Sequence, residues 1–316
     1  MLPTNESARP ALPDRAPRLW TLWAAARPSQ VLLVALVYAL GLGIATNGPP
    51  FAGDEWQGLG VELPSLLAGL LAVVAVTVPI HYANEYADAE TDRLTERTPF
   101  SGGSGALART GLPRRFLRRA TAAATVGSVL AISGLVTTGN HTPAALLTVI
   151  LGLGLAYSLP PVALIRRGVG ELVNAVLGGL LLPLYGVSVV AIPRPAVAAV
   201  VLPFALLVGC NLCATHWPDR DADARVGKRT LAVRLVPEKL RRLYATLAVA
   251  AGLIIVTLWA IDLLPTPLVL AHLPAVPLLL WGWRTLARQR SPFPAVAAMV
   301  VVAVTTTVAW WWLGVG

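Results

Sequence analysis

The sequence predicts an all-α integral membrane protein with nine transmembrane helices. The 316-residue chain is 56% hydrophobic and only 13% charged, which is too apolar for a soluble globular domain. It contains nine apolar runs of about 18 residues or more, the length of helix that crosses the hydrocarbon core of a bilayer. Almost all of its Lys and Arg residues fall in alternate connections between these runs, which is typical of a membrane protein with a fixed orientation.

The predicted spans follow one another along the chain with short connections, which leave no room for a separate soluble domain. Residues 1–27 are polar and rich in Pro and Arg, and they lack the early apolar core of a signal peptide. We therefore expect a cytoplasmic tail, 1–27, followed by a single transmembrane domain, 28–316. The spans are expected at about 29–46, 63–83, 120–138, 143–159, 172–192, 196–216, 243–261, 265–283 and 293–313.

Loop charges predict the orientation. If the N-terminus is cytoplasmic, the inside segments carry 24 of the 25 Lys and Arg residues, and the opposite face carries only Arg194. An odd number of spans then places the C-terminus outside. The net charge of +9 is explained by this topology and by anionic lipid, so it does not indicate nucleic-acid binding. A bacterial cytoplasmic membrane is the expected location.

The densest acidic segment, 84–100, directly follows an almost wholly apolar run. Asn84, Asp88 and Asp92 are spaced four residues apart, which places them along one stripe of a continuous helix. Like charges at this spacing repel unless a cation neutralises them, and oxygen ligands of this kind suit Mg²⁺. A solvated loop between two spans is the simpler alternative. The other carboxylates of the segment point elsewhere on such a helix and are expected to be solvated: Glu85, Glu90 and Glu96.

A second acidic cluster follows the sixth predicted span, in "PDRDADARVGKRTLAVRL". Asp219 and Asp223 again stand four residues apart, and Lys228 follows them closely. Both clusters lie on the same predicted membrane face, each at the end of a span. Two Asp pairs joined by Mg²⁺ and surrounded by cations would hold a diphosphate well. One solvated acidic loop would be unremarkable, but two such pairs at one face favour a binding site.

The connection between the fourth and fifth spans reads "AYSLPPVALIRRGVGELV". Tyr157 stands at the end of a span, two prolines break the helix, and Arg166 and Arg167 follow. One interpretation is a helix end with arginines of the positive-inside kind. The other places Tyr157 near the acidic clusters, with an arginine facing a phosphate group. The segment alone leaves both open.

Together these segments resemble the UbiA superfamily of intramembrane prenyltransferases. The resemblance is carried by "NEYADAETDRLTERTPFSGG", "YSLPPVALIRRGVGEL" and "PDRDADARVGKRTLAVRL", in the family's order and across about 27–240. The pieces "TPFSGGS" and "GKRTLAVRL" look closest to the branch that prenylates dihydroxynaphthoate-type acceptors in menaquinone synthesis. The resemblance implies helices around a central cavity, with the Asp-rich motifs on cytoplasmic cap loops.

The resemblance also implies an activity. It implies Mg²⁺-dependent transfer of a prenyl group from an isoprenoid diphosphate, geranylgeranyl or longer, to a lipophilic aromatic acceptor of the quinone-precursor kind. The C–O bond ionises to an allylic cation, which Tyr157 would stabilise through its ring. The implied metal ligands are Asn84, Asp88, Asp92, Asp219 and Asp223, of which the four aspartates and Tyr157 are the implied catalytic residues. The implied diphosphate-binding residues are Lys228, Arg166, Arg97, Arg93 and Arg27.

The sequence departs from the family pattern at one position, and further residues are possible members of the site. Thr215 occupies the position one turn before Asp219 where many members have Asn or Asp, and Asn211 lies a further turn back. His81, one turn before Asn84, is intramembrane and should face the cavity. We therefore include His81, Asn211 and Thr215 as possible site residues and expect His216 to be a packed or interfacial residue.

A terpene cyclase with the same diphosphate site stays open as an alternative function, whereas a transporter is disfavoured because the carboxylates gather at one face and not at the midplane.

Overall fold

The computed structural model describes residues 12–53, 63–98, 100 and 102–315. Within these ranges the chain is helical and forms no strand, and an isolated bridge joins Ala52 to Pro193. The described residues contain nine helical segments that are long and apolar enough to cross a membrane, so the predicted all-α class and number of spans are confirmed. These segments are Pro17–Ala45, Leu63–Asp88, Arg115–Thr137, His141–Ser158, Gly170–Ser188, Pro195–Thr215, Pro237–Ala260, Thr266–Thr285 and Phe293–Gly314.

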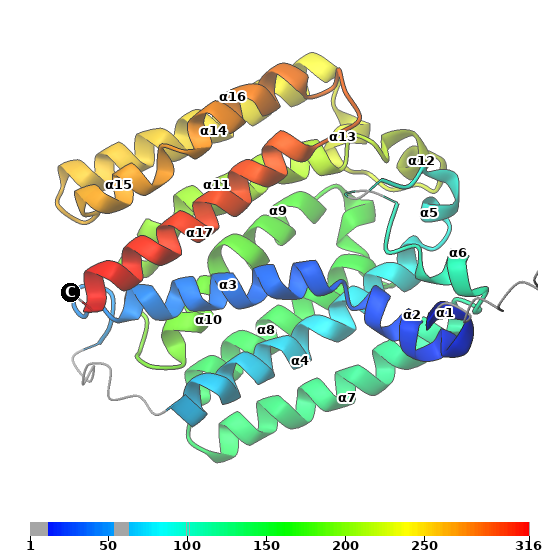
Figure 1. Ribbon diagram of the computed structural model, residues 1–316, viewed down its shortest axis with the longest axis horizontal. Helices are drawn as coiled ribbons and strands as arrows, with labels where there is room; N and C mark the ends of the chain where they lie inside the picture. The colour runs from blue at the N-terminus through cyan, green and yellow to red at the C-terminus, as the bar shows by residue number, and fades with distance from the viewer. Residues whose placement is uncertain (1–11, 54–62, 99, 101, 316) are drawn as a thin grey trace, which may run out of the picture.

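The long helices lie side by side along the longest axis of the molecule, and the short helices gather at one end (Figure 1). The C-terminus lies at the opposite end. The helices of the bundle are α3 (Pro28–Ala45), α4 (Leu63–Asp88), α7 (Arg115–Thr137), α8 (His141–Ser158), α9 (Gly170–Val176), α10 (Leu182–Ser188), α11 (Pro195–Thr215), α14 (Pro237–Ala260), α15 (Thr266–His272), α16 (Ala275–Thr285) and α17 (Phe293–Val315). The helices at its end are α1 (Leu12–Arg15), α2 (Pro17–Ala25), α5 (Thr91–Leu94), α6 (Ala106–Thr110), η1 (Leu164–Arg167), α12 (Arg220–Arg225) and α13 (Leu231–Arg234).

Several helices extend past the apolar runs that predict them. The second span continues through polar residues to Asp88, and the seventh begins at Pro237, six residues before its apolar run. Hydropathy marks only the part of a helix that lies in apolar surroundings, whereas backbone hydrogen bonds continue through good helix formers such as Glu, Lys and Arg. Residues 12–25, within the predicted tail, also form helices. The division of the chain at residue 27 and the orientation of the termini stay predictions.

The fifth span contains a π-helical turn, η2 (Leu177–Leu181), between α9 and α10, where it packs closely on its neighbours. Gly179 in this turn lies against Ala205 of α11, and a Cβ on Gly179 would come within 2.3 Å of the Ala205 Cα. A Cβ on Gly41 of α3 would likewise lie 2.8 Å from the Gly186 Cα of α10. Small residues at such crossings let helix backbones approach each other, which favours packing in a membrane.

The interior is filled by apolar side chains and by tyrosines, two of which, Tyr38 and Tyr185, donate hydrogen bonds to backbone carbonyls. The Tyr38 and Tyr185 rings are 5.8 Å apart, and their hydroxyls donate to the carbonyls of Leu66 and Gly69 at 2.9 and 2.7 Å. The outer helices instead expose large apolar side chains, as Leu130 of α7 shows with an exposed fraction of 67%. Apolar outer faces of this extent fit contact with lipid.

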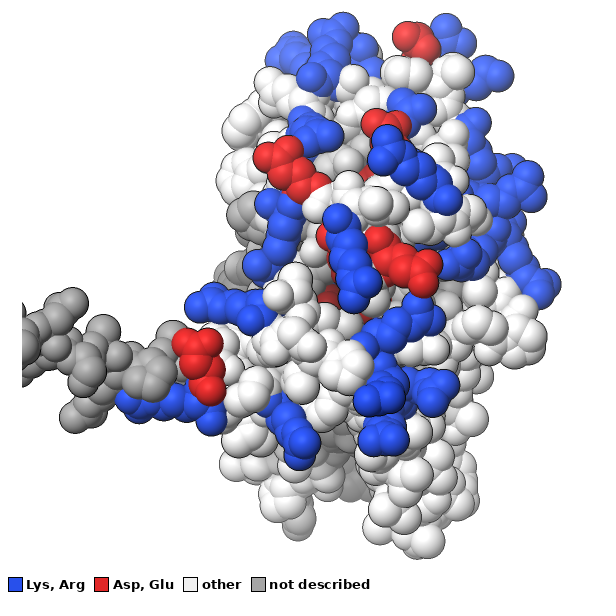
Figure 2. Space-filling view, turned by 90° about the vertical axis from the view of Figure 1, so that its right-hand side faces the viewer, with Lys and Arg blue, Asp and Glu red and all other residues white. Residues whose placement is uncertain are grey.

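The end that carries the short helices is densely charged. Figure 2 shows this end, with Lys and Arg side chains surrounding a smaller group of Asp and Glu side chains. This is the face that the loop charges predict to be cytoplasmic. The candidate functional site lies at this end of the molecule, where α4 ends and α12 begins.

Candidate functional site

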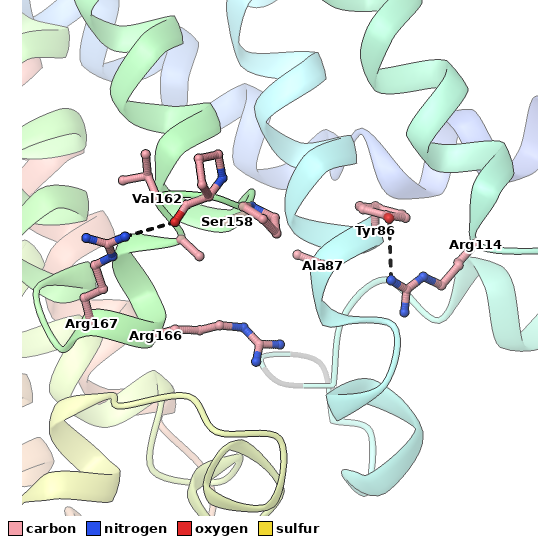
Figure 3. A pocket seen from close by; sticks show the side chains of 10 residues that line it. Tyr86, Ala87, Arg114, Ser158, Val162, Arg166 and Arg167 are labelled. Atoms are coloured by element: carbon pink, nitrogen blue, oxygen red, sulfur yellow. Dashed lines mark hydrogen bonds between the residues drawn. The ribbon is translucent and has the colours of Figure 1, made fainter.

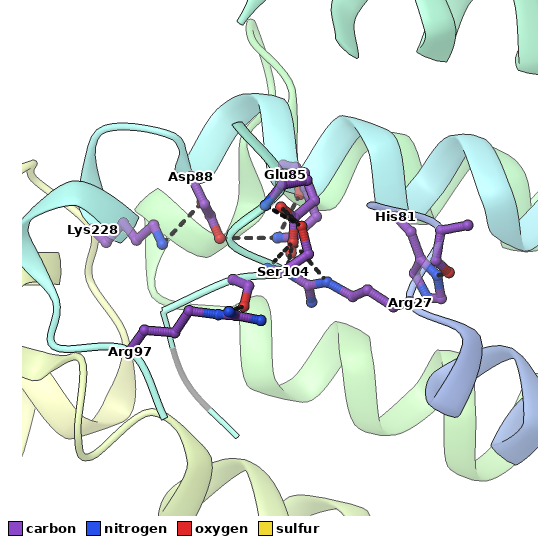
Figure 4. A network of polar contacts seen from close by, with 12 residues as sticks. Arg27, His81, Glu85, Asp88, Arg97, Ser104 and Lys228 are labelled. Carbon is purple, nitrogen blue, oxygen red and sulfur yellow. Dashed lines mark hydrogen bonds and ion pairs between the residues drawn. The ribbon is translucent and has the colours of Figure 1, made fainter. Parts of the chain in front are cut away.

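Lys228 joins the two acidic motifs. Its Nζ lies 2.9 Å from Oδ1 of Asp88, at the end of α4, and 3.0 Å from Oδ1 of Asp223, on α12. The Lys228 side chain is only 8% exposed, and Figure 4 shows it directed at Asp88. Burial disfavours the ammonium, but the two carboxylates outweigh burial and raise the pKa of Lys228. Two segments distant in the sequence therefore meet at one buried cation.

The first motif does not form the single helical stripe that its spacing predicts. Asn84 and Asp88 share α4, where Asn84 Nδ2 donates to Asp88 Oδ2 at 3.1 Å and to Ser158 Oγ at 3.3 Å. Helix α4 ends at Asp88, and Asp92 lies on the separate helix α5. Ending α4 at Asp88 relieves the repulsion that a continuous helix would create between the two carboxylates.

Asp92 packs against the loop that follows the motif. Gly103 has a positive φ of 65°, and a Cβ there would come within 2.1 Å of Asp92 Oδ2. Burial, followed by the nearby carboxylates of Asp88 and Glu85, raises the pKa of Asp92 to about 7. Asp92 therefore lies where negative charge is only partly neutralised.

Glu85, which the spacing assigns to solvent, is instead buried, with an exposed fraction of 3%. Its Oε1 accepts from Arg27 Nη2 at 2.6 Å and from the Ser104 backbone amide at 2.8 Å, and its Oε2 accepts from the Ser104 hydroxyl at 2.7 Å (Figure 4). The helical spacing shows that Glu85 lies off the side of α4 that carries Asp88. It does not show which residues cover the side of α4 that carries Glu85. The prediction is therefore wrong for Glu85. For Glu90 and Glu96, which form exposed ion pairs with Arg114 and Arg290, it is confirmed.

In the second motif, Asp219 immediately precedes α12 and Asp223 lies on it. The Asp223 backbone amide donates to the Asp219 carbonyl at 2.8 Å, so this short helix keeps both side chains one turn apart. Burial, and then the neighbouring Asp223 carboxylate, raises the pKa of Asp219 to about 6. Burial also raises the pKa of Asp223, although the positive charge of Lys228 acts in the opposite direction. Asp219 Oδ1 is buried and has no hydrogen-bond partner in the part of the chain that the structure describes.

These acidic residues fit Mg²⁺. Their side-chain donor atoms are oxygens, and among the described residues the buried Oδ1 of Asp219 has no hydrogen-bond partner. Within the part of the chain that the structure describes, no three His, Cys, Asp or Glu side chains lie close enough to form a metal site by themselves. Mg²⁺ typically keeps several waters and uses one or two carboxylates together with substrate phosphates, which suits paired aspartates.

Glu171 is a buried site residue that the sequence analysis missed. It lies on α9, and its Oε1 accepts from the Leu231 backbone amide at 2.5 Å and from His216 Nδ1 at 3.0 Å. Burial disfavours protonated His216, but the hydrogen bond and charge of Glu171 outweigh burial and raise the pKa of His216. His216 is packed, as expected. A Glu inside an apolar helical segment is itself a signal of a polar partner.

Two further predicted residues lie beside the cluster. Tyr157 is partly buried at the end of α8, and a Cβ on Gly170 would lie 3.2 Å from its ring. Arg166 Nη1 donates to the Val226 carbonyl at 2.7 Å, which ties η1 to the segment between α12 and Lys228.

The other arginines that were predicted to contact the diphosphate lie near different residues. Arg93 and Arg97 are exposed, and Arg97 Nε donates to the Gly103 carbonyl at 3.4 Å. Arg27, bound to Glu85, keeps 22% of its side chain exposed.

The three possible site residues are held by local contacts. His81 Nδ1 lies 2.7 Å from the Ala26 carbonyl, in the break between α2 and α3. The Thr215 hydroxyl donates to the Asn211 carbonyl at 3.0 Å, so it is occupied by its own helix. Asn211 Oδ1 is buried, and none of the described residues donates a hydrogen bond to it. Of the three, Asn211 therefore has a buried acceptor atom left over.

A cavity of about 390 Å³ opens beside the cluster, between the ends of α4 and α8 and the η1 segment (Figure 3). Its lining includes Arg166 and Ser158. The Ser158 hydroxyl is the one that accepts a hydrogen bond from Asn84. The cavity thus lies next to the first motif but outside the Asp–Lys228 cluster. A further cavity along the axis of the bundle, which the resemblance implies, stays a prediction.

Comparison with known proteins identifies a family. The model of the UbiA prenyltransferase family matches residues 34–304. No curated protein sequence matches the chain. The predicted superfamily is therefore confirmed by the family match, whereas the dihydroxynaphthoate branch is not.

Solved structures share this fold at low sequence identity. A UbiA homologue from Archaeoglobus fulgidus bound to GPP and Mg²⁺ is 16% identical with a TM-score of 0.70, and the match covers 94% of this chain and 100% of that one. A structure of digeranylgeranylglyceryl phosphate synthase is 14% identical with a TM-score of 0.63, covering 93% and 99%. The apo structure of a UbiA homologue from Aeropyrum pernix K1 is 16% identical with a TM-score of 0.63, covering 87% and 96%.

Proposed function

Since this chain belongs to the UbiA prenyltransferase family, we propose that it transfers a prenyl group from an isoprenoid diphosphate to a lipophilic aromatic acceptor, with Mg²⁺ as cofactor. The observation that carries this proposal is the contact of Lys228 with both Asp88 and Asp223, at 2.9 and 3.0 Å. One buried cation between two acidic motifs, at one end of a bundle of apolar helices, is a site prepared for phosphate groups and metal together.

Both aspartate pairs contribute to the diphosphate site. The carboxylates of Asp88 and Asp92 from the first motif, and of Asp219 and Asp223 from the second, would hold Mg²⁺. Asn84 orients Asp88 through its 3.1 Å hydrogen bond. When bound, Mg²⁺ neutralises the carboxylates and supplies positive charge to the departing diphosphate. Lys228 supplies a fixed ammonium at the same place. The residues that add charge at the rim are Arg27, Arg93, Arg97 and Arg166.

Charge stabilisation at the diphosphate explains the proposed chemistry. The C–O bond of the substrate breaks, both bonding electrons leave with the diphosphate, and an allylic cation remains. An electron-rich ring carbon of the acceptor then forms the new C–C bond, and the ring loses a proton. Lys228 stabilises the charge on the leaving group without reorganising, because its two carboxylate contacts already hold it in place. Tyr157 presents a ring to the allylic cation, and the apolar helices exclude water that would quench it.

A GPP- and Mg²⁺-bound UbiA homologue supports the donor class, and a DMAPP- and Mg²⁺-bound one supports it too. For this chain we propose a longer donor, geranylgeranyl or above, and an acceptor of the quinone-precursor kind in a bacterial cytoplasmic membrane. The N-terminus would lie in the cytoplasm and the C-terminus outside. The 24-to-1 distribution of Lys and Arg between the two faces supports this orientation.

The test incubates the purified full-length protein with Mg²⁺ and geranylgeranyl diphosphate, with and without a panel of quinone precursors, and measures diphosphate release and prenylated product. We expect release that depends on an acceptor. Release of diphosphate without an acceptor, together with a cyclic hydrocarbon, would instead identify a terpene cyclase. Asp88→Ala and Asp219→Ala should each abolish release while the protein stays folded in detergent, and full activity of either variant would contradict the metal assignment.

A further inference from the structure

The cavity between α4, α8 and η1 has an unusual charge. Its lining includes three guanidinium groups, those of Arg114, Arg166 and Arg167, and no carboxylate. Figure 3 shows Arg166 and Arg167 on one side and Arg114 on the other. An apolar wall completes it, formed by Pro161 and Val162 among others. A volume of about 390 Å³ lies within the range of sites that take a small ligand or a headgroup.

The arginines on the η1 side carry charge that no carboxylate neutralises within the described residues. Arg166 Nη1 donates to the Val226 carbonyl at 2.7 Å, and Arg167 Nη2 donates to the Pro161 carbonyl at 2.9 Å. A guanidinium has five N–H donors, so most of them remain available in each residue. The backbone contacts therefore fix the two side chains at the cavity without neutralising either one.

Arg114 completes the site from the opposite side. Its guanidinium lies over the Tyr86 ring, 4.8 Å from the ring centre, and pairs with the exposed Glu90 at 2.8 Å. An exposed ion pair is weak and exchanges easily with other partners. Arg114 can therefore turn toward an anion in the cavity while the Tyr86 ring still holds it.

The position of the cavity indicates the source of the anion. It lies where two candidate membrane spans, α4 and α8, end, and α7 begins at the next residue after Arg114. About three to four turns further along α7, Val126 and Leu130 are exposed by 61% and 67%, so the outer face of this helix faces lipid. The rim is therefore level with the headgroups of the leaflet that the Lys and Arg distribution predicts to be cytoplasmic. Basic pockets between spans on that side bind anionic headgroups.

We propose that this cavity binds the phosphate headgroup of one anionic phospholipid, with the acyl chains directed along the apolar surface of α7. The lining shares Arg166 with the rim of the proposed diphosphate site, but it includes neither the aspartates of the two motifs nor Lys228, so the lipid headgroup lies beside the diphosphate and not in its place. The lining residue Ser158 accepts a hydrogen bond from Asn84 at 3.3 Å, and it therefore joins the lipid site to the first acidic motif.

The test compares binding of short-chain phosphatidylglycerol by wild-type protein and by the double variant Arg114→Gln/Arg167→Gln. Neither residue belongs to the proposed catalytic machinery. Dioctanoyl phosphatidylglycerol is titrated into detergent-purified full-length protein, and binding is followed by the melting temperature and by native mass spectrometry. We expect saturable binding by the wild-type protein that is about tenfold weaker, or more, in the double variant. Dioctanoyl phosphatidylcholine should not bind saturably to either protein.

A matched control separates a built site from general surface charge. Arg284→Gln/Arg288→Gln removes the same charge from exposed arginines at the same end of the molecule, outside the cavity. This control should bind phosphatidylglycerol as the wild type does, and equal weakening in both double variants would overturn the proposal. The single variant Arg167→Gln loses a hydrogen bond to a backbone carbonyl, that of Pro161, so we expect it to fold and to show part of the effect.

Two further arms distinguish the source of the phosphate. Inorganic phosphate at the same concentration should not displace the lipid, because it lacks the apolar contacts; equal displacement would indicate a free-phosphate site and overturn the lipid assignment. The KM for the prenyl diphosphate should stay within about twofold of wild type in Arg114→Gln/Arg167→Gln. A large rise in that KM, with unchanged lipid binding, would assign the cavity to the substrate and contradict the proposal.

Discussion

Glu171 and His216 form a buried ion pair behind the second acidic motif, with Glu171 Oε1 lying 3.0 Å from His216 Nδ1. The same oxygen accepts from the Leu231 backbone amide at 2.5 Å. Glu171 belongs to α9, His216 follows α11, and Leu231 begins α13. One carboxylate therefore fixes both ends of the segment that carries Asp219, Asp223 and Lys228.

Replacing Glu171 should loosen this segment. Glu171→Gln removes the ion pair and weakens the hydrogen bond to Leu231, so we expect a loss of about 1–3 kcal/mol in the free energy of unfolding. Thermal melting in detergent would show a lower transition temperature, and Mg²⁺-dependent activity should fall with it. Glu238→Gln, at an exposed position of α14, provides the control and should melt as the wild type does. An unchanged transition in Glu171→Gln would contradict the structural role.

Lys228 should be needed for both binding and chemistry. Lys228→Met keeps the length of the side chain but leaves Asp88 and Asp223 without their shared cation. We expect kcat/KM for the prenyl diphosphate to fall by about 100-fold or more, since a fixed charge at a leaving group is worth about 3 kcal/mol. Steady-state kinetics at saturating Mg²⁺ would measure this. Lys228→Arg should recover only part of the activity, because a planar guanidinium does not fit between two carboxylates as an ammonium does.

Glu85 and Asp88 lie three residues apart on α4 and should separate structural from metal-binding roles. Glu85→Gln loses the Arg27 ion pair, so we expect a lower melting temperature with an unchanged Mg²⁺ concentration for half-maximal activity. Asp88→Asn removes a proposed metal ligand, so activity should be lost even at high Mg²⁺. Mg²⁺ titrations and thermal melts on both variants would measure the two effects. The reverse pattern would exchange the roles of the two residues.

Two glycines with nearly the same backbone conformation provide a steric test of the first motif. Gly103 and Gly111 have φ values of 65° and 67°, so alanine is similarly strained at either position. A Cβ at Gly103 would meet Asp92 Oδ2 at 2.1 Å, whereas a Cβ at Gly111 has nothing within 4 Å. Gly103→Ala should displace Asp92 and raise the Mg²⁺ requirement about tenfold, a change of about 1.4 kcal/mol. Gly111→Ala should leave it unchanged; equal effects would show that backbone strain alone is responsible.

The stability of the Mg²⁺-free protein should depend on pH. The pKa values of Asp92 and Asp219, about 7 and about 6, are higher in the folded chain than the ordinary carboxyl value. Between the ordinary value and these raised values the folded state binds more protons than the unfolded state, so stability falls as pH rises through that window. Melting temperatures measured between pH 5 and pH 8 should therefore decrease. Saturating Mg²⁺ or the Asp92→Asn variant should reduce the slope, and an identical slope in all three would contradict the assignment.

The amino-acid sequence determined the class of the fold and the chemistry of the site. Apolar runs mark membrane helices because a spanning segment must satisfy its backbone hydrogen bonds internally and keep apolar side chains toward lipid. Spacing alone also selected Asn84 with Asp88, and Asp219 with Asp223, because residues four apart share one side of a helix. These are local properties, and the sequence contains them directly.

Only the tertiary structure decided which distant groups meet. Lys228 lies between Asp88 and Asp223 because α4 and α12 converge at one end of the bundle, and no spacing rule in the sequence encodes that distance. Glu85 resembles a solvated carboxylate in the sequence, yet Arg27 and Ser104 enclose it. The physical reason is the same in each case. The burial and pairing of a charged side chain depend on what packs against its outer face, and that face is covered by segments far away in the chain.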